Sequence, residues 1–141
     1  MKRTVLAVAI VGTGVLLGDE KKVENREHNC QISVPANWDV STMSGLASAP
    51  DKSFTVAMSS PKMVDSFAKI KEIAKATYKR TKVTKDTATE FEMEGQSLGG
   101  KPNVYRAIPV AGNRFCLADV TYTGAAVEEA RRIARTMKGT K

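Results

Sequence analysis

Apolar and polar residues alternate in several short segments of this chain, as they do in strands that bury one face. The first segment runs from Cys30 to Val34 and ends where the stretch from Pro35 to Asn37 breaks the pattern. The second covers Ser53 to Ser59, and a third covers Thr89 to Glu94. We interpret all three segments as strands.

Two further strands, Asn103 to Val110 and Arg114 to Thr123, are predicted on either side of a hairpin loop. Pro109 has no backbone N–H to donate to a partner strand, so the first of these is expected at a sheet edge or at a bulge. Both faces of the hairpin are apolar, which predicts helices packed on both sides of the sheet. The expected register places Val110 opposite Phe115, Ile108 opposite Leu117, and Arg106 opposite Asp119 as an ion pair.

Helical periodicity identifies two more elements. A first helix is expected to begin at Ser60 and Pro61, a capping residue followed by a residue favoured in the first turn, and to end near residue 79. A second helix is expected from Ala125 to Lys138, with acidic residues near its start and basic residues toward its end, as the helix dipole favours. The apolar stripe of the first helix consists of Met63, Phe67, Ile70, Ala74 and Tyr78.

The N-terminus has the layout of a secretory signal peptide. Lys2 and Arg3 precede an uncharged run from Thr4 to Gly18, which is shorter than the roughly 20 residues of a membrane-spanning helix. We therefore predict export to the periplasm or the medium, and the alternative is that the segment is retained as an anchor. The cleavage site is undefined, because cleavage after Gly18 would place the bulky Leu16 where a small residue is preferred. The expected organisation is a signal peptide (1–18), a charged segment (19–29), one α+β domain (30–138) and a short tail (139–141).

The chain contains two cysteines, Cys30 and Cys116, an even number that suits an exported protein. A disulfide between them would close a long loop and stabilise the fold by roughly 4 to 5 kcal/mol in the chain-entropy model. The alternative is a pair of buried thiols.

The net charge is +7, and basic residues concentrate between positions 62 and 85. Lys71, Lys75 and Lys79 form a stripe on the first predicted helix, and together with Lys82 they are the predicted partner-binding residues. Three interpretations of the stripe remain open: a solvated helix face, a docking surface for an acidic protein, or a contact with an anionic membrane surface. A protein partner could instead add a strand at the expected edge Asn103 to Val110. Nucleic acid is not expected as a partner, because the aromatic residues are committed to the core and the chain is exported.

One segment resembles a phosphate-binding loop. It is GQSLGGKP, from Gly95 to Pro102, and it matches the glycine and lysine spacing of that motif. However, Pro102 stands where the hydroxyl residue belongs, and a strand rather than a helix is expected to follow. We therefore expect a turn between two strands and no nucleotide.

Other candidate chemistry fails in the same way. Ser59 to Lys62 matches the S-x-x-K of serine acyl-enzymes, but the companion elements S-D-N and K-T-G are missing. His28 is the chain's single histidine and is expected in solvent. Glu90, Glu92 and Glu94 share a strand face that we expect to point to water. In water their pKa values would stay similar, whereas an acid–base pair needs two carboxylates with different pKa values. The sequence therefore predicts no catalytic, cofactor or metal site.

Several phrases resemble the PsbP-like superfamily: ISVPANW (32–38), FTVAMSSP (54–61), YRAIPVAGNRFCLADVTYTG (105–124) and EEARRIARTMK (128–138). The superfamily consists of small α/β/α sandwiches around an antiparallel sheet, and it includes photosystem accessory proteins, a nuclear import factor that binds Ran, and exported bacterial proteins. It shares no catalytic set. The resemblance implies an α+β sandwich with a non-enzymatic binding or assembly role.

Overall fold

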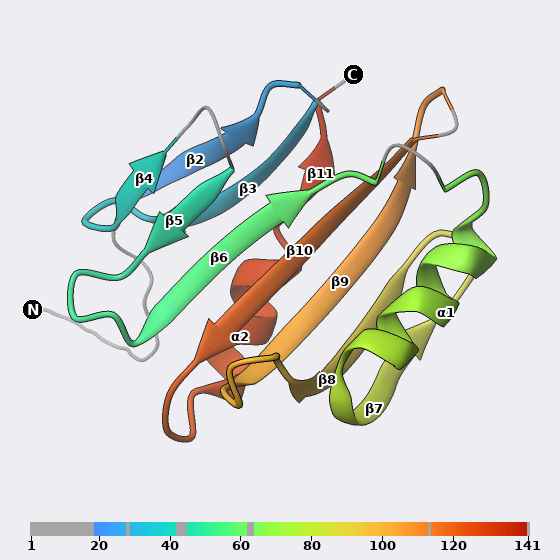
Figure 1. Ribbon diagram of the computed structural model, residues 1–141. Helices are drawn as coiled ribbons and strands as arrows, with labels where there is room; N and C mark the ends of the chain where they lie inside the picture. The colour runs from blue at the N-terminus through green and yellow to red at the C-terminus, as the bar shows by residue number, and fades with distance from the viewer. Residues whose placement is uncertain (1–18, 28, 42–44, 62–63, 113, 141) are drawn as a thin grey trace, which may run out of the picture.

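The computed structural model describes residues 19–27, 29–41, 45–61, 64–112 and 114–140. Its centre is a seven-stranded antiparallel sheet with the strand order β4-β5-β6-β10-β9-β8-β7 (Figure 1). In that order the strands are Asp39–Ser41, Leu46–Ser48, Phe54–Ser59, Arg114–Tyr122, Pro102–Val110, Phe91–Gln96 and Lys79–Asp86.

Two layers cover the faces of this sheet. Helix α1 (Phe67–Thr77) packs on one face over β8, β9 and β10. Helix α2 (Val127–Ala134) and a three-stranded sheet of order β11-β3-β2 cover the other face (Figure 1). The strands of this small sheet are Lys138–Gly139, Cys30–Pro35 and Glu20–Asn25. The predicted α+β class, an antiparallel sheet with helices on its faces, is confirmed. No helix within the described ranges is long and apolar enough to cross a membrane.

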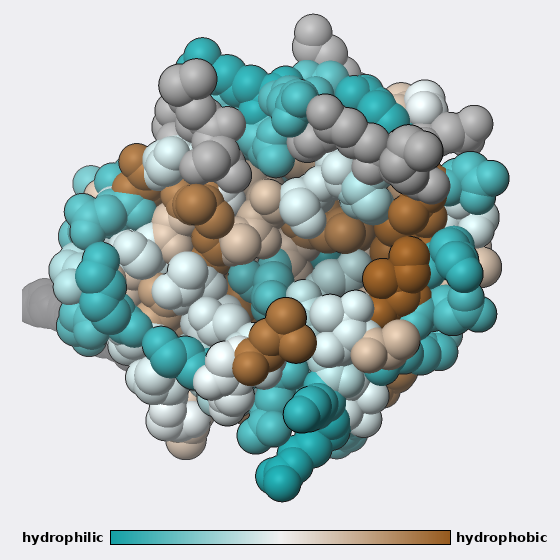
Figure 2. All heavy atoms as spheres, in the orientation of Figure 1, coloured by the Kyte–Doolittle hydropathy of each residue, from teal (hydrophilic) through white to brown (hydrophobic). Residues whose placement is uncertain are grey.

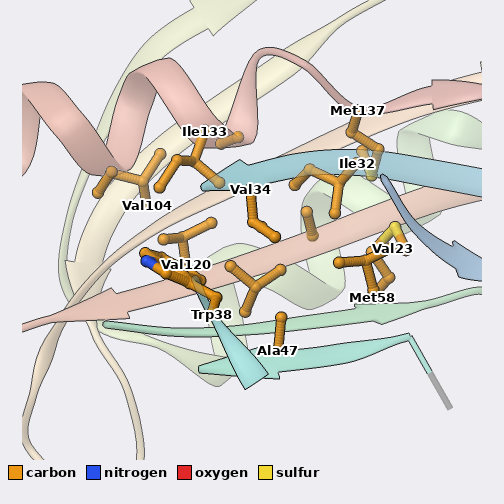
Figure 3. Close-up of a cluster of buried hydrophobic side chains, with 14 of the residues drawn as sticks. Val23, Ile32, Val34, Trp38, Ala47, Met58, Val104, Val120, Ile133 and Met137 are labelled. Carbon is orange, nitrogen blue, oxygen red and sulfur yellow. The ribbon is translucent and has the colours of Figure 1, made fainter. Parts of the chain in front are cut away.

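The core is divided between the two sides of the large sheet. The larger cluster lies between that sheet and the layer formed by α2 and the small sheet, and includes Val34, Trp38, Val120 and Ile133 (Figure 3). The smaller cluster lies under α1. Its buried members are Ile70, Ala74, Phe91, Met93, Tyr105, Ala107 and Phe115.

A disulfide joins Cys30 in β3 to Cys116 in β10, with the two Cα atoms 5.9 Å apart. The predicted bridge is thus present, and it ties the small sheet to a central strand of the large one. Both cysteines are buried in the larger cluster.

The hairpin formed by β9 and β10 differs from the prediction by one residue of register. Val110 pairs with Arg114, so Arg106 lies opposite Ala118 and does not pair with Asp119. A slip of one residue moves every side chain to the other face, and here both faces are apolar, so the hydrophobic pattern does not select the register. The predicted ion pair across the hairpin is wrong.

Strand β9 is also not an edge, because β10 and β8 pair with it on either side. Pro109 is tolerated since the last pair between β9 and β8 joins Ala107 to Phe91, two positions before the proline. The true edge near α1 is β7. This strand was not predicted, because all eight of its residues are exposed and no buried period marks it.

The helix α1 starts later than expected. Its N-cap is Ser66, whose Oγ accepts a hydrogen bond from the backbone N–H of Lys69 at 3.1 Å, whereas Ser60 precedes the helix. It ends at Thr77, so Lys79 belongs to β7 rather than to the helix. Met63, predicted on its apolar face, lies outside the described residues, as do residues 1–18.

The segment expected to be a charged extension contains β2. Within it, Val23 is fully buried in the larger cluster while its neighbours on the strand carry the charge. At the other end of the chain, Lys138 and Gly139 pair with Gln31 and Cys30 and form β11. Both ends of the described chain therefore contribute to the small sheet.

The close approach of β7 to β8 requires a glycine at position 95. A Cβ atom there would lie 2.9 Å from the carbonyl oxygen of Lys79, a backbone atom that cannot swing away. We expect Gly95→Ala to lower the free energy of unfolding by about 1 to 3 kcal/mol, measured by urea denaturation. Gly99→Ala is the matched control, because a Cβ at Gly99 meets nothing within 4 Å. An equal effect of the two substitutions would contradict this role of Gly95.

Candidate functional site

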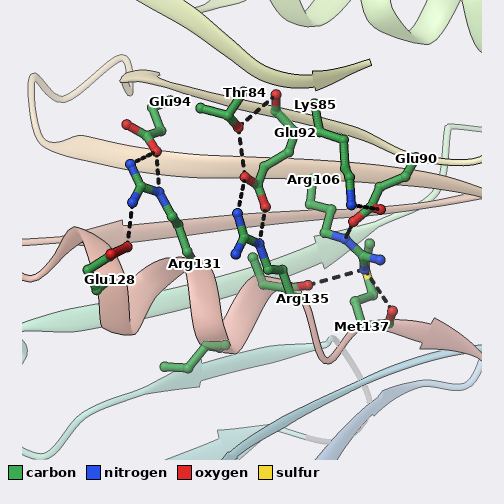
Figure 4. Close-up of polar contacts among 12 residues, drawn as sticks. Thr84, Lys85, Glu90, Glu92, Glu94, Arg106, Glu128, Arg131, Arg135 and Met137 are labelled. Atoms are coloured by element: carbon green, nitrogen blue, oxygen red, sulfur yellow. Dashed lines mark hydrogen bonds and ion pairs between the residues drawn. The ribbon is translucent and has the colours of Figure 1, made fainter. Parts of the chain in front are cut away.

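Glu92 and Glu94 of β8 pair with Arg135, the C-cap of α2, and with Arg131 of α2, rather than facing water (Figure 4). Glu92 is fully buried, and both of its carboxylate oxygens accept hydrogen bonds from Arg135, each at 2.8 Å. The hydroxyl of Thr84 donates a third hydrogen bond to Oε2 at 2.7 Å. The prediction that this face of the strand is solvated is wrong.

The neighbouring glutamates are paired in the same way. Glu94 forms an ion pair with Arg131 of α2, and Glu90 accepts from Nε of Arg106 at 2.7 Å. Arg106 also donates to the carbonyl oxygen of Met137, at 2.8 Å. This row of charges, shown in Figure 4, clamps α2 and the segment after it onto β8 and β9.

The network keeps the carboxylates of Glu90 and Glu92 ionised. Burial alone would raise the pKa of Glu92, but hydrogen bonds from Arg135 and Thr84 outweigh it, so the pKa lies below its ordinary value. The pKa of Glu90 is lowered by Arg106 and Lys85 in the same way, again against the effect of burial. Carboxylates held in this state serve structure better than acid–base chemistry.

A second polar cluster lies on the other face of the sheet, beside the end of α1. Asn103 donates from Nδ2 to Asp119 at 2.7 Å, and the hydroxyl of Tyr78 donates to the same carboxylate at 3.0 Å. Burial raises the pKa of Asp119 against these two hydrogen bonds. Sequence reasoning assigned Asp119 to Arg106 and Tyr78 to an apolar stripe, and so missed this contact.

One residue of the predicted stripe, Lys71, is already neutralised, as is Lys85 nearby. Lys71 reaches Asp86 at 2.5 Å and the carbonyl oxygen of Thr87 at 3.0 Å, and only 18% of its side chain is exposed. Lys85 pairs with Glu90 at 3.0 Å. Lys71 therefore holds the β7–β8 turn against α1, and its charge is already compensated within the fold.

Four other cations gather where α1 ends and β7 begins. They are Lys75 on the helix and Lys79, Arg80 and Lys82 on the strand, and we call them the basic surface. All four are exposed, and among the described residues none has a carboxylate oxygen within 4.0 Å. Lys75 Nζ lies 5.9 Å from the ring centroid of Phe91. Arg80 was not among the predicted binding residues, because β7 was not recognised.

An open groove adjoins the basic surface along α1. Its volume is about 540 Å³, and its walls mix cationic and apolar side chains. Figure 2 shows hydrophilic residues along the margin of the molecule that carries α1. The lining residues are Phe67, Ala68, Lys71, Glu72, Lys75 and Ala88.

Comparison with known proteins identifies the type of fold. No protein-family model matches the chain, and no curated protein matches it. The solution structure of cyanobacterial PsbP (CyanoP) from Synechocystis sp. PCC 6803 is similar over 93% of this chain and 97% of its own length, with a TM-score of 0.54. The chain has the PsbP-like fold. The two sequences are 8% identical, so the likeness concerns the fold alone.

In this PsbP-like domain, the motifs considered for catalysis have structural roles. The glycine-rich segment forms the β8–β9 turn, where Ser97 and Lys101 pair through the backbone and Gly100 adopts a φ of 84°. Pro102 then begins β9, so no helix presents amides to a phosphate. Ser59 ends β6, while His28 and Lys62 lie outside the described residues. No cluster of potential metal ligands occurs in the described part of the chain.

Proposed function

We propose that this protein is an exported, non-enzymatic accessory module that docks an acidic protein partner through the basic surface. The observation that carries the proposal is the set of four exposed cations that have no carboxylate partner among the residues the structure describes, in a fold where Lys69, Lys71, Lys85 and Arg106 are all paired. Unpaired like charges held together repel one another, and an acidic partner relieves that repulsion.

Export is supported by two features of the chain. The disulfide between Cys30 and Cys116 suits an oxidising compartment, and the apolar N-terminal run has the layout of a signal peptide. An accessory role fits the PsbP-like fold, and Glu90, Glu92 and Glu94 are paired with arginines rather than free for chemistry.

The proposal predicts the behaviour of a charge-neutralised variant. Replacing Lys75, Lys79, Arg80 and Lys82 by glutamine should weaken binding of the partner by about 30-fold, because each exposed charge pair contributes modestly and the effects accumulate. High salt should weaken the unaltered protein to a similar extent. The measurement is affinity capture from an envelope extract of the source organism, followed by titration of the captured protein.

The control is a second variant with the same loss of charge elsewhere. Lys21, Lys22, Lys52 and Lys138 are remote from β7, and their replacement by glutamine should leave binding within twofold of the unaltered protein. Equal loss in both variants would show that net charge alone matters, which contradicts a defined docking surface. Vesicles with and without anionic lipid form a separate arm, and binding that requires such lipid would favour the membrane alternative.

A further inference from the structure

Strand β7 is the outermost strand of the seven-stranded sheet on the side of α1. It pairs with β8 on one side, and no strand within the described ranges pairs with it on the other. An edge strand of this kind carries backbone N–H and C=O groups that can pair with a further strand. All eight residues of β7 are exposed, so no helix or loop among the described residues covers it.

The edge strand β7 carries three of the four cations of the basic surface. Lys79, Arg80 and Lys82 lie along β7, and Lys75 flanks it from the last turn of α1. Val83, with 40% of its surface exposed, adds an apolar contact among these charges. The sequence suggested the basic helix face or the strand Asn103 to Val110 as alternative docking elements, whereas the structure places exposed cations and a sheet edge together on β7.

Two features of β7 disfavour pairing with another copy of itself. Its cations would face like charges across the new ladder, which is unfavourable. The pairing of β7 with β8 also shifts register between Lys79 and Lys82 and again between Val83 and Lys85, and Arg80 has a φ of 54°. These bulges shorten the run that can pair continuously. The edge therefore suits a short strand of opposite charge.

We propose that β7 binds an extended acidic segment of the partner by strand addition. This inference rests on the proposed function and specifies its mode. Backbone hydrogen bonds along the free edge of β7 hold the segment, while acidic side chains of the segment meet Lys79, Arg80 and Lys82. The acidic segment lies as an eighth strand beside the seven-stranded sheet.

The test uses two synthetic peptides of alternating glutamate and valine with equal length and charge. In one of them, alternate backbone amides are N-methylated, which removes the hydrogen-bond donors of one edge and keeps the side chains. We expect the unmodified peptide to bind the protein at least about tenfold more tightly, since several backbone hydrogen bonds are lost in the other. Amide hydrogen exchange should slow in β7 with the unmodified peptide only.

The outcomes separate this inference from the proposed function. Equal binding of the two peptides, with no change of exchange in β7, would overturn strand addition and leave charge docking intact. Binding of the unmodified peptide that survives glutamine replacement of Lys79, Arg80 and Lys82 would overturn the role of these cations in selecting the segment. Failure of both peptides to bind, while the natural partner still requires the basic surface, would overturn strand addition alone.

Discussion

Removing the disulfide between Cys30 and Cys116 is expected to lower the free energy of unfolding by about 4 to 5 kcal/mol. The two cysteines are 86 positions apart, so the bridge removes a large share of the freedom of the unfolded chain. In the folded state it ties β3 to β10, and thereby the small sheet to the large one. The change is the double variant Cys30→Ala with Cys116→Ala, measured by urea denaturation with the m-value fitted separately for each protein.

The reduced, unaltered protein is the control for the loss of the sulfur atoms. If the cross-link is responsible, reduction and double substitution should destabilise by similar amounts. Hydrogen exchange should then quicken first in β2 and β3, because those strands depend on the bridge and on packing of Val23 and Ile32. A loss below about 1 kcal/mol would show that apolar packing alone holds the small sheet in place.

The strands that could be predicted from the sequence are those that carry several buried apolar residues. Cys30–Pro35 and Phe54–Ser59 alternate clearly between apolar and polar residues, and the sequence indicated both. Strand β7 shows no alternation of apolar and polar residues, because its eight residues are all exposed and only one of them, Val83, is apolar. Its partner strand and the bulged pairing define it, and neither feature is visible in a local pattern.

The row of glutamates formed by Glu90, Glu92 and Glu94 was predicted to face solvent, and that prediction failed for a related reason. A charged face of a strand is usually solvated, and nothing within Phe91–Gln96 itself indicates a cover. The signal lies far away in the chain, in the spacing of Arg131 and Arg135. Residues four apart on a helix rise about 6 Å, and residues two apart on a strand advance about 6.8 Å. Arg131 of α2 and Arg135 at its C-cap are therefore spaced to reach Glu94 and Glu92 of β8, as the structure shows.

Removing the ion pair between Arg135 and Glu92 by Arg135→Ala is expected to lower the free energy of unfolding by about 3 kcal/mol near neutral pH. Arg135→Ala would leave the fully buried carboxylate of Glu92 with the hydroxyl of Thr84 as its remaining hydrogen-bond donor from a side chain. We place the effect at the lower end for broken buried pairs, because 55% of the Arg135 side chain is exposed and water can reach part of the site. The measurement is denaturant unfolding.

The effect of Arg135→Ala should depend on pH. The folded pKa of Glu92 lies below its unfolded value, so the pair stabilises the protein above the unfolded pKa of about 4.3 and loses that contribution as pH falls through the folded pKa. In the variant, burial is no longer offset by Arg135, and the folded pKa of Glu92 should rise above its ordinary value. The difference in stability between the two proteins should therefore be largest near neutral pH and shrink below about pH 4.

Two further variants decide whether the buried charge is the cause. Glu92→Gln combined with Arg135→Ala removes the charge but keeps the shape, so it should recover most of the stability lost in the single variant, because an unpaired amide costs less than an unpaired carboxylate. Arg132→Ala is the matched control, since Arg132 pairs with Glu129 and Glu20, which are both partly exposed, and should cost no more than about 1 kcal/mol. If Arg135→Ala costs no more than Arg132→Ala at every pH, the row of glutamates is an ordinary surface network, and α2 is held to the sheet by Ala130, Ile133 and Ala134 alone.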